Sequence, residues 1–274
     1  MTESTLYPFF RTPSPFNSEA PLFIYLPGMD GTGELLHVQL AGLEQGFDIR
    51  CLSIALDDLS SWEQLTEQLV SLIEVELKRQ PRDVVYLCGE SFGGCLALKT
   101  ILRSPHLFDR LVLINPASSF KRYPWIYWGS HLVCPLPDVL YRMSCVSFLP
   151  VLAALGRIGE HDRFALLRAT QSVAQNTSIW RLSLLREFTI SESELHYITQ
   201  PTLVVASARD SLLPSVSEAH WLTDHIPNAQ MHILPNSGHA CLLESDVNLY
   251  QIMQTSNFLY QPKPGIRTVQ PQLS

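Results

Sequence analysis

The stretch that decides the fold reads Gly89-Glu90-Ser91-Phe92-Gly93-Gly94. It follows a short apolar run, Val84 to Cys88, and precedes a run of helical character, Cys95 to Leu102. A chain that turns this sharply from a strand into a helix strains the serine backbone and leaves no room for side chains two positions away, so glycine is needed at 89 and 93. The pattern predicts that Ser91 is exposed at the carboxyl end of a central strand, beside the N-terminus of the next helix.

Short apolar runs of the same kind recur along the chain and predict buried strands. Helical periodicity separates them, most clearly over Trp62 to Arg79, where apolar residues recur at steps of three and four. Strands that alternate with helices indicate crossover units, and therefore an α/β fold with a mainly parallel sheet and helices on both faces. The predicted strands are Leu22 to Leu26, Phe47 to Ile54, Val84 to Cys88, Leu111 to Ile114, Leu203 to Ala206 and Met231 to Leu234.

A serine hydroxyl needs a neighbouring base before it can act as a nucleophile, and this turn predicts partners in the chain order Ser, Asp, His. Asp210 follows the predicted strand Leu203 to Ala206, and His239 follows Met231 to Leu234. Carboxyl ends of parallel strands share one edge of a sheet, so these side chains should meet Ser91 there. His239 would take the serine proton, and Asp210 would fix the tautomer of His239.

Each partner alone has an ordinary explanation. Asp210 is suitably placed to cap a helix that begins near Ser215, and a lone histidine such as His239 is most often a surface residue. The conjunction of three residues at three strand ends favours the catalytic interpretation. After Leu111 to Ile114 the chain reads Asn115-Pro116, so no competing carboxylate follows that strand.

An oxyanion formed on the substrate needs two backbone N–H donors. Phe92, the residue after the candidate nucleophile, supplies one. The second is expected from the glycine-rich loop Leu26-Pro27-Gly28-Met29-Asp30-Gly31-Thr32-Gly33, with Met29 as the candidate donor. A phosphate-binding loop is the rival interpretation, but the lysine of a P-loop and the spacing of a dinucleotide fingerprint are both missing.

No cofactor and no metal site is predicted. The six cysteines form no Cys-x-x-Cys pair, which disfavours a structural zinc site. His220, Asp224 and His225 lie on one predicted surface helix, but His225 points away from the face that His220 and Asp224 share.

The composition and charge of the chain limit which functions and locations are expected. The chain has 274 residues, a formal charge of −7 and no run of Lys or Arg, so nucleic-acid binding is disfavoured. No export signal and no apolar stretch of about 18 residues is visible, which predicts reduced thiols, a cytoplasmic location and no membrane-spanning helix. Peripheral contact with a membrane and the oligomeric state stay open.

One domain is expected over residues 21–260, because the strands on either side of 118–200 must share a sheet. Residues 118–200, rich in tryptophan, phenylalanine and proline without a convincing strand, are interpreted as a helical cap insertion over that sheet. Residues 1–20 and 261–274 are expected to be a loose N-terminal segment and a C-terminal tail.

With these residues in place the sequence resembles an α/β-hydrolase. The motifs L-P-G-M-D-G-T-G, G-E-S-F-G-G-C-L-A-L, A-R-D-S-L-L-P-S and N-S-G-H are similar to those of the hydrolase-type half of the plant chloroplast esterase/lipase/thioesterase family, the phytyl ester synthases, and of its cyanobacterial and bacterial hydrolase relatives. The resemblance covers about Phe23 to Leu259. It implies acyl transfer on lipids, with Ser91, Asp210 and His239 at the catalytic positions.

The resemblance stops short of the plant proteins' second, acyltransferase-like domain, since none of the nine histidines is followed by aspartate in an H-x-x-x-x-D motif. The first hypothesis is therefore a serine hydrolase that cleaves carboxylic esters with an apolar acyl group. Acyl transfer to phytol or another lipid alcohol, and thioester hydrolysis, are alternatives that use the same triad. A non-catalytic hydrolase fold that only binds small molecules is the hypothesis from another class.

Overall fold

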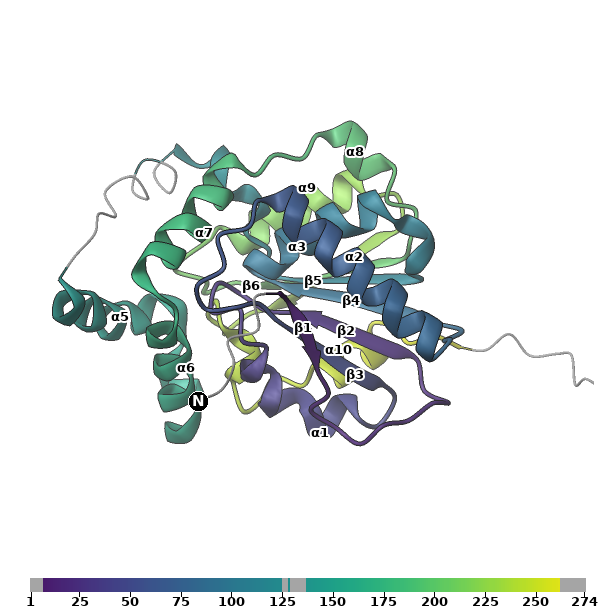
Figure 1. The fold of residues 1–274 in the computed structure, drawn as a ribbon, viewed down its shortest axis with the longest axis horizontal. Coiled ribbons are helices and arrows are strands. Elements are labelled where there is room, and N and C mark those ends of the chain that lie inside the picture. The colour runs from purple at the N-terminus through teal and green to yellow at the C-terminus, as the bar shows by residue number, and fades with distance from the viewer. Residues whose placement is uncertain (1–6, 125–127, 129–136, 262–274) are drawn as a thin grey trace, which may run out of the picture.

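The computed structural model describes residues 7–124, 128 and 137–261. Seven strands form one sheet in the order β1-β3-β2-β4-β5-β6-β7 (Figure 1). β1 pairs antiparallel with β3, and all other neighbours are parallel, which confirms the predicted mainly parallel sheet. The strands are β1 Phe9–Arg11, β2 Leu22–Leu26, β3 Asp48–Ser53, β4 Val85–Glu90, β5 Arg110–Ile114, β6 Thr202–Ser207 and β7 Ala229–Leu234.

Both faces of the sheet are covered by helices (Figure 1). α2, α3 and α9 lie on one face, and α1 and α10 lie on the other. A continuous apolar strand suits this arrangement because successive side chains enter opposite layers: Ile24 of β2 packs in the first layer and Phe23 in the second. The helices are α1 Leu40–Leu43, α2 Trp62–Arg79, α3 Phe92–Arg103, α5 Asp138–Leu152, α6 Glu160–Ser172, α7 Gln175–Glu187, α8 Glu192–His196, α9 Ser215–His225 and α10 Leu249–Thr255.

The ends of α2 agree with its sequence signals. Ser61 accepts a hydrogen bond from the Gln64 backbone, and the Gln64 side chain accepts one from the Ser61 backbone, which forms a capping box. Trp62, Leu65 and Leu69 are buried against the sheet layer. The predicted range, Trp62 to Arg79, is therefore confirmed.

β1 was not anticipated from the sequence. Phe9–Arg11 lies within the segment 1–20 that was expected to be loose, yet Phe10 pairs opposite Leu52 at the edge of the sheet. A strand of three residues beside prolines has too few positions to show an alternating pattern. β1 is a strand because it pairs with β3, which is a tertiary contact.

The described part of the connection between β5 and β6 contains α5, α6, α7 and the short α8, and we refer to α5, α6 and α7 as the connecting helices (Figure 1). Two of these helices contribute to a separate buried apolar cluster, in which Leu149 of α5 and Leu166 of α6 pack with Leu243. Among the described residues, no helix combines the length and the apolar character required to cross a membrane. Cys51, Cys88, Cys95, Cys145 and Cys241 are free thiols.

Candidate active site

Ser91 stands at the turn between β4 and α3 in a strained backbone conformation, with φ 52° and ψ −113°. A Cβ atom built on Gly89 would lie 2.3 Å from the carbonyl oxygen of Gly93, and one on Gly93 would lie 2.1 Å from the carbonyl oxygen of Leu26. Backbone atoms leave no room for either. The predicted steric need for glycine at both positions is confirmed.

The structure brings Ser91, Asp210 and His239 together at the carboxyl edge of the sheet. His239 Nε2 lies 2.9 Å from Ser91 Oγ, and His239 Nδ1 lies 2.7 Å from Asp210 Oδ2. Asp210 is held in turn, because the backbone N–H groups of Leu212 and Leu213 donate to its Oδ1 at 2.8 and 2.9 Å. The three groups form a continuous series of hydrogen bonds in the order that a nucleophile, its base and an orienting acid would require.

Electrostatics favour a charged acid beside a basic imidazole. Burial acts to raise the pKa of Asp210, but the charge of His239 and hydrogen bonds from His239, Ser215 and Leu213 outweigh burial, so that pKa lies below its ordinary value. Burial acts to lower the pKa of His239, but the charge and hydrogen bond of Asp210 and the charge of Glu90 raise it above the ordinary value. His239 is therefore suited to accept a proton from Ser91.

The glycine-rich loop lies against the candidate nucleophile. A Cβ atom on Gly28 would be 3.8 Å from Ser91 Cβ, so Met29 lies in the next position of a loop that touches Ser91. Within the described part of the chain, the backbone N–H groups of Met29 and Phe92 have no hydrogen-bond acceptor. An oxyanion requires two such donors, and here one lies in this loop and the other directly after Ser91.

Arg181 of α7 fixes this loop, a role that sequence reasoning missed. Its guanidinium donates to the Met29 carbonyl at 2.6 Å and to the Ala55 carbonyl at 3.0 Å. The whole residue is only 2% exposed. Gly31 takes a positive φ of 69°, and a side chain there would clash with the same guanidinium. The connecting helices thus set the position of the loop through a buried arginine.

A cavity of about 220 Å³ opens onto Ser91 and His239. Its other walls come largely from the connecting helices and are mostly apolar. Cavities of this kind, apolar with a few convergent polar groups, are typical of small-molecule sites. The lining residues of the connecting helices and the segment after α6 are Tyr141, Cys145, Phe148, Leu152, Leu166, Thr170, Val173 and Ser178.

Glu90, the residue before Ser91, is not among the predicted catalytic residues, and it lines the same cavity. Burial raises the pKa of Glu90 to about 7, against the hydrogen bond from Tyr25 and the charge of His239, which both act to lower it. The Tyr25 hydroxyl donates to the Glu90 carboxylate. The only sequence signal was its place beside Ser91, which does not reveal that a tyrosine from β2 would meet it.

Two further polar side chains hold the loop that carries His239. Asn115, with φ 41°, donates to the His239 carbonyl at 2.7 Å and to Ser207 Oγ at 2.9 Å. Glu244 accepts from the Gly238 N–H at 2.8 Å and pairs with Arg157 at 2.6 Å. From the sequence, Asn115 showed only that no competing acid follows the strand. In the structure, its side-chain amide hydrogen-bonds to Ser207 at the end of β6 and to the loop that carries His239.

Comparison with known proteins finds a matching family model and similar curated proteins. The family model described as "Serine aminopeptidase, S33" matches residues 57–246. Phytyl ester synthase 1, chloroplastic, of Arabidopsis thaliana is 29% identical over 86% of this chain, and the chain spans only 37% of that relative's length. The pimeloyl-[acyl-carrier protein] methyl ester esterase of Nitrosomonas europaea is 26% identical over 68% of this chain and 73% of its own length.

Solved structures with the same fold are also found. The esterase EaEST from Exiguobacterium antarcticum superposes with a TM-score of 0.69 at 16% identity, over 87% of this chain and 92% of its own. The expected α/β-hydrolase fold and the expected similarity to phytyl ester synthases and bacterial hydrolases are therefore confirmed.

Proposed function

This chain belongs to the serine aminopeptidase, S33, family, and on that premise we propose that it hydrolyses carboxylic esters through a covalent acyl-enzyme on Ser91. The observation that carries the proposal is the hydrogen-bonded chain from Asp210 through His239 to Ser91, facing an apolar cavity. A non-catalytic binding protein would not need this series of hydrogen bonds from Asp210 through His239 to Ser91.

The proposed reaction has two steps. His239 removes the Ser91 proton while Oγ attacks the ester carbonyl, and the resulting oxyanion accepts hydrogen bonds from the N–H groups of Met29 and Phe92. His239 then passes the proton to the departing alcohol, which leaves the acyl group on Ser91. Water, deprotonated by His239, attacks the acyl-enzyme, and the acid and the free serine are released.

An apolar acyl group is the substrate class that the cavity favours. Leu152, Leu166 and Val173 lie on walls that offer few polar partners for a charged substrate. We propose that residues 118–200 act as a cap on a single domain of residues 21–260, and that the cap sets the accepted acyl length. The methyl ester esterase among the relatives supports ester cleavage as the reaction class.

Acyl transfer to a lipid alcohol is the second candidate, and the similarity to a phytyl ester synthase favours it. The same acyl-enzyme reacts with water or with an alcohol, depending on which nucleophile the cavity binds. Thioesters would use the same residues.

A substrate series tests the proposal. We expect p-nitrophenyl esters to be cleaved with kcat/KM rising along the acyl series until the cavity is filled, measured by release of p-nitrophenol. Product analysis by mass spectrometry, with and without phytol, separates free acid from phytyl ester. Phytyl ester as the main product would replace hydrolysis by transfer, and cleavage of aminoacyl p-nitroanilides in place of esters would contradict both.

The substitution Glu90→Gln is expected to shift the acid limb of the pH dependence of kcat/KM to lower pH. Ionised Glu90 favours protonated His239, and only the neutral imidazole acts as the base, so removal of the charge lets His239 lose its proton at lower pH. The pH profile of p-nitrophenyl ester cleavage measures the shift. Glu187→Gln, an exposed acid on α7, is the control for net charge; an equal shift in both variants, or none in Glu90→Gln, would contradict the role of Glu90.

A further inference from the structure

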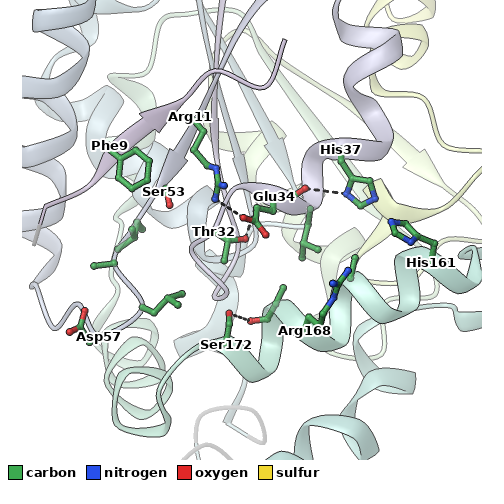
Figure 2. A pocket seen from close by; sticks show the side chains of 16 residues that line it. Phe9, Arg11, Thr32, Glu34, His37, Ser53, Asp57, His161, Arg168 and Ser172 are labelled. Atoms are coloured by element: carbon green, nitrogen blue, oxygen red, sulfur yellow. Dashed lines mark hydrogen bonds and ion pairs between the residues drawn. The ribbon is translucent and has the colours of Figure 1, made fainter. Parts of the chain in front are cut away.

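The larger described cavity, about 840 Å³, lies away from Ser91 and His239. Its walls come from β1, from the end of β3 with the following residues, from α6, and from η1, the short 3₁₀ helix Glu34–Gln39 that follows the glycine-rich loop (Figure 2). At its rim the rings of His37 and His161 lie edge to face, with centroids 6.2 Å apart (Figure 2). Asp162 lies beside them. Nothing in the ester reaction uses this cluster.

The ligand atoms of His37, His161 and Asp162 all lie within 4.8 Å of one another. His37 belongs to η1, whereas His161 and Asp162 lie in the first turn of α6. Their side chains are partly open to solvent, so an ion could enter from the cavity.

The contacts of His37 are compatible with a metal-bound imidazole as well as with an ion pair to Asp162. Its Nδ1 lies 3.1 Å from the Glu34 carbonyl oxygen, and its Nε2 lies 2.7 Å from Asp162 Oδ1. A neutral imidazole has one N–H, and both neighbours are acceptors. If Nδ1–H donates to the carbonyl, the lone pair of Nε2 faces a carboxylate. A second proton on the ring, which gives the ion pair with Asp162, or a metal ion that both groups bind, removes this conflict. A backbone carbonyl on the other ring nitrogen is the usual partner of a metal-bound histidine.

We propose that His37, His161 and Asp162 bind a divalent transition-metal ion, best matched by Zn²⁺. Two imidazoles and one carboxylate are a ligand set that zinc accepts, whereas Mg²⁺ and Ca²⁺ prefer oxygen ligands throughout. Bonds of 2.0–2.1 Å in tetrahedral geometry place ligands about 3.3 Å apart. Small side-chain movements reach that spacing from the present one, and water from the cavity fills the fourth position.

The site would join two parts of the molecule. α6 is one of the connecting helices, and η1 directly follows the loop that carries Met29. Leu35 and Val38 of η1 already pack against the apolar cluster that contains Leu166 of α6. Bound zinc would add coordination bonds between η1 and α6 next to this apolar contact. It would stabilise the packing of the connecting helices on the sheet and would take no part in the ester reaction.

Metal titration of the tag-free 274-residue chain tests the proposal. After EDTA treatment and dialysis, we expect one Zn²⁺ per chain by elemental analysis, and an increase in Tm of about 5 °C or more when free Zn²⁺ exceeds the Kd about 100-fold. His161→Gln, a change at an exposed residue, should fold normally and weaken zinc binding at least about tenfold.

Two controls make the result decisive. His106→Ala removes an exposed histidine outside the cluster and should bind zinc as the wild type does. Mg²⁺ at equal ionic strength should leave Tm unchanged. A zinc response that persists undiminished in both His161→Gln and Asp162→Asn would overturn the proposal, as would a wild-type chain that binds no zinc.

Discussion

Replacement of Ser91 by alanine is expected to lower kcat for a p-nitrophenyl ester by about 10⁴-fold to 10⁶-fold, since the nucleophile of a hydrogen-bonded triad acts as a unit with its base. The folded state should be kept, because alanine differs from serine at this backbone position only by the missing hydroxyl, and the substitution removes one part-buried hydrogen bond, that to His239 Nε2. Steady-state kinetics measure the loss of activity, and thermal unfolding checks the fold.

A fluorophosphonate probe tests the same residue directly. The wild type should form an adduct that mass mapping locates on Ser91, and His239→Ala should lose most of the labelling because the serine then lacks its base. Ser178→Ala is the matched control, since Ser178 lines the same cavity and bonds to Tyr141 rather than to the triad. Full activity in Ser91→Ala, or a folded wild type that takes no label, would refute the proposed mechanism.

Gly93→Ala is expected to destabilise the chain by more than about 4 kcal/mol, a large part of the roughly 5–15 kcal/mol that stabilises an average domain. The new Cβ would lie 2.1 Å from the Leu26 carbonyl oxygen and 2.5 Å from that of Pro27. Leu26 pairs with Gly89 in the middle of the sheet, so these atoms cannot retreat without breaking the ladder between β2 and β4. Urea unfolding measures the loss of stability. If the Gly93→Ala variant does not fold, its soluble yield is compared with that of the wild type.

Gly156→Ala provides the contrast for this prediction. No atom lies within 4 Å of a Cβ at Gly156, and its φ is not in the positive range. Its free energy of unfolding should change by no more than about 0.5 kcal/mol. Similar stability losses in both variants would show that the close approach at Gly93 is relieved by backbone movement.

Pairings over long chain separations could not be predicted from the sequence. His37 meets Asp162 across 125 positions, and Arg181 meets the Met29 carbonyl across 152. The prediction of no metal site rested on the cysteine spacings and on His220, Asp224 and His225 of one helix. The cluster of His37, His161 and Asp162 combines residues of η1 and α6, and the sequence does not show that these two elements meet. Such contacts depend on how the connecting helices lie on the sheet, and no local pattern encodes that.

The sequence by itself determined the strand–turn–helix around Ser91, the parallel sheet and the order in which Asp210 and His239 follow. Strand periodicity, steric demands for glycine and the placement of polar residues after strands are properties of neighbouring residues, and neighbours are what a sequence displays. Only the tertiary structure decided the hydrogen-bonded distances of the triad, the burial of Glu90 against Tyr25 and the role of Asn115. These depend on which strands become adjacent and on how far each is buried, because hydrogen bonding and desolvation act through space.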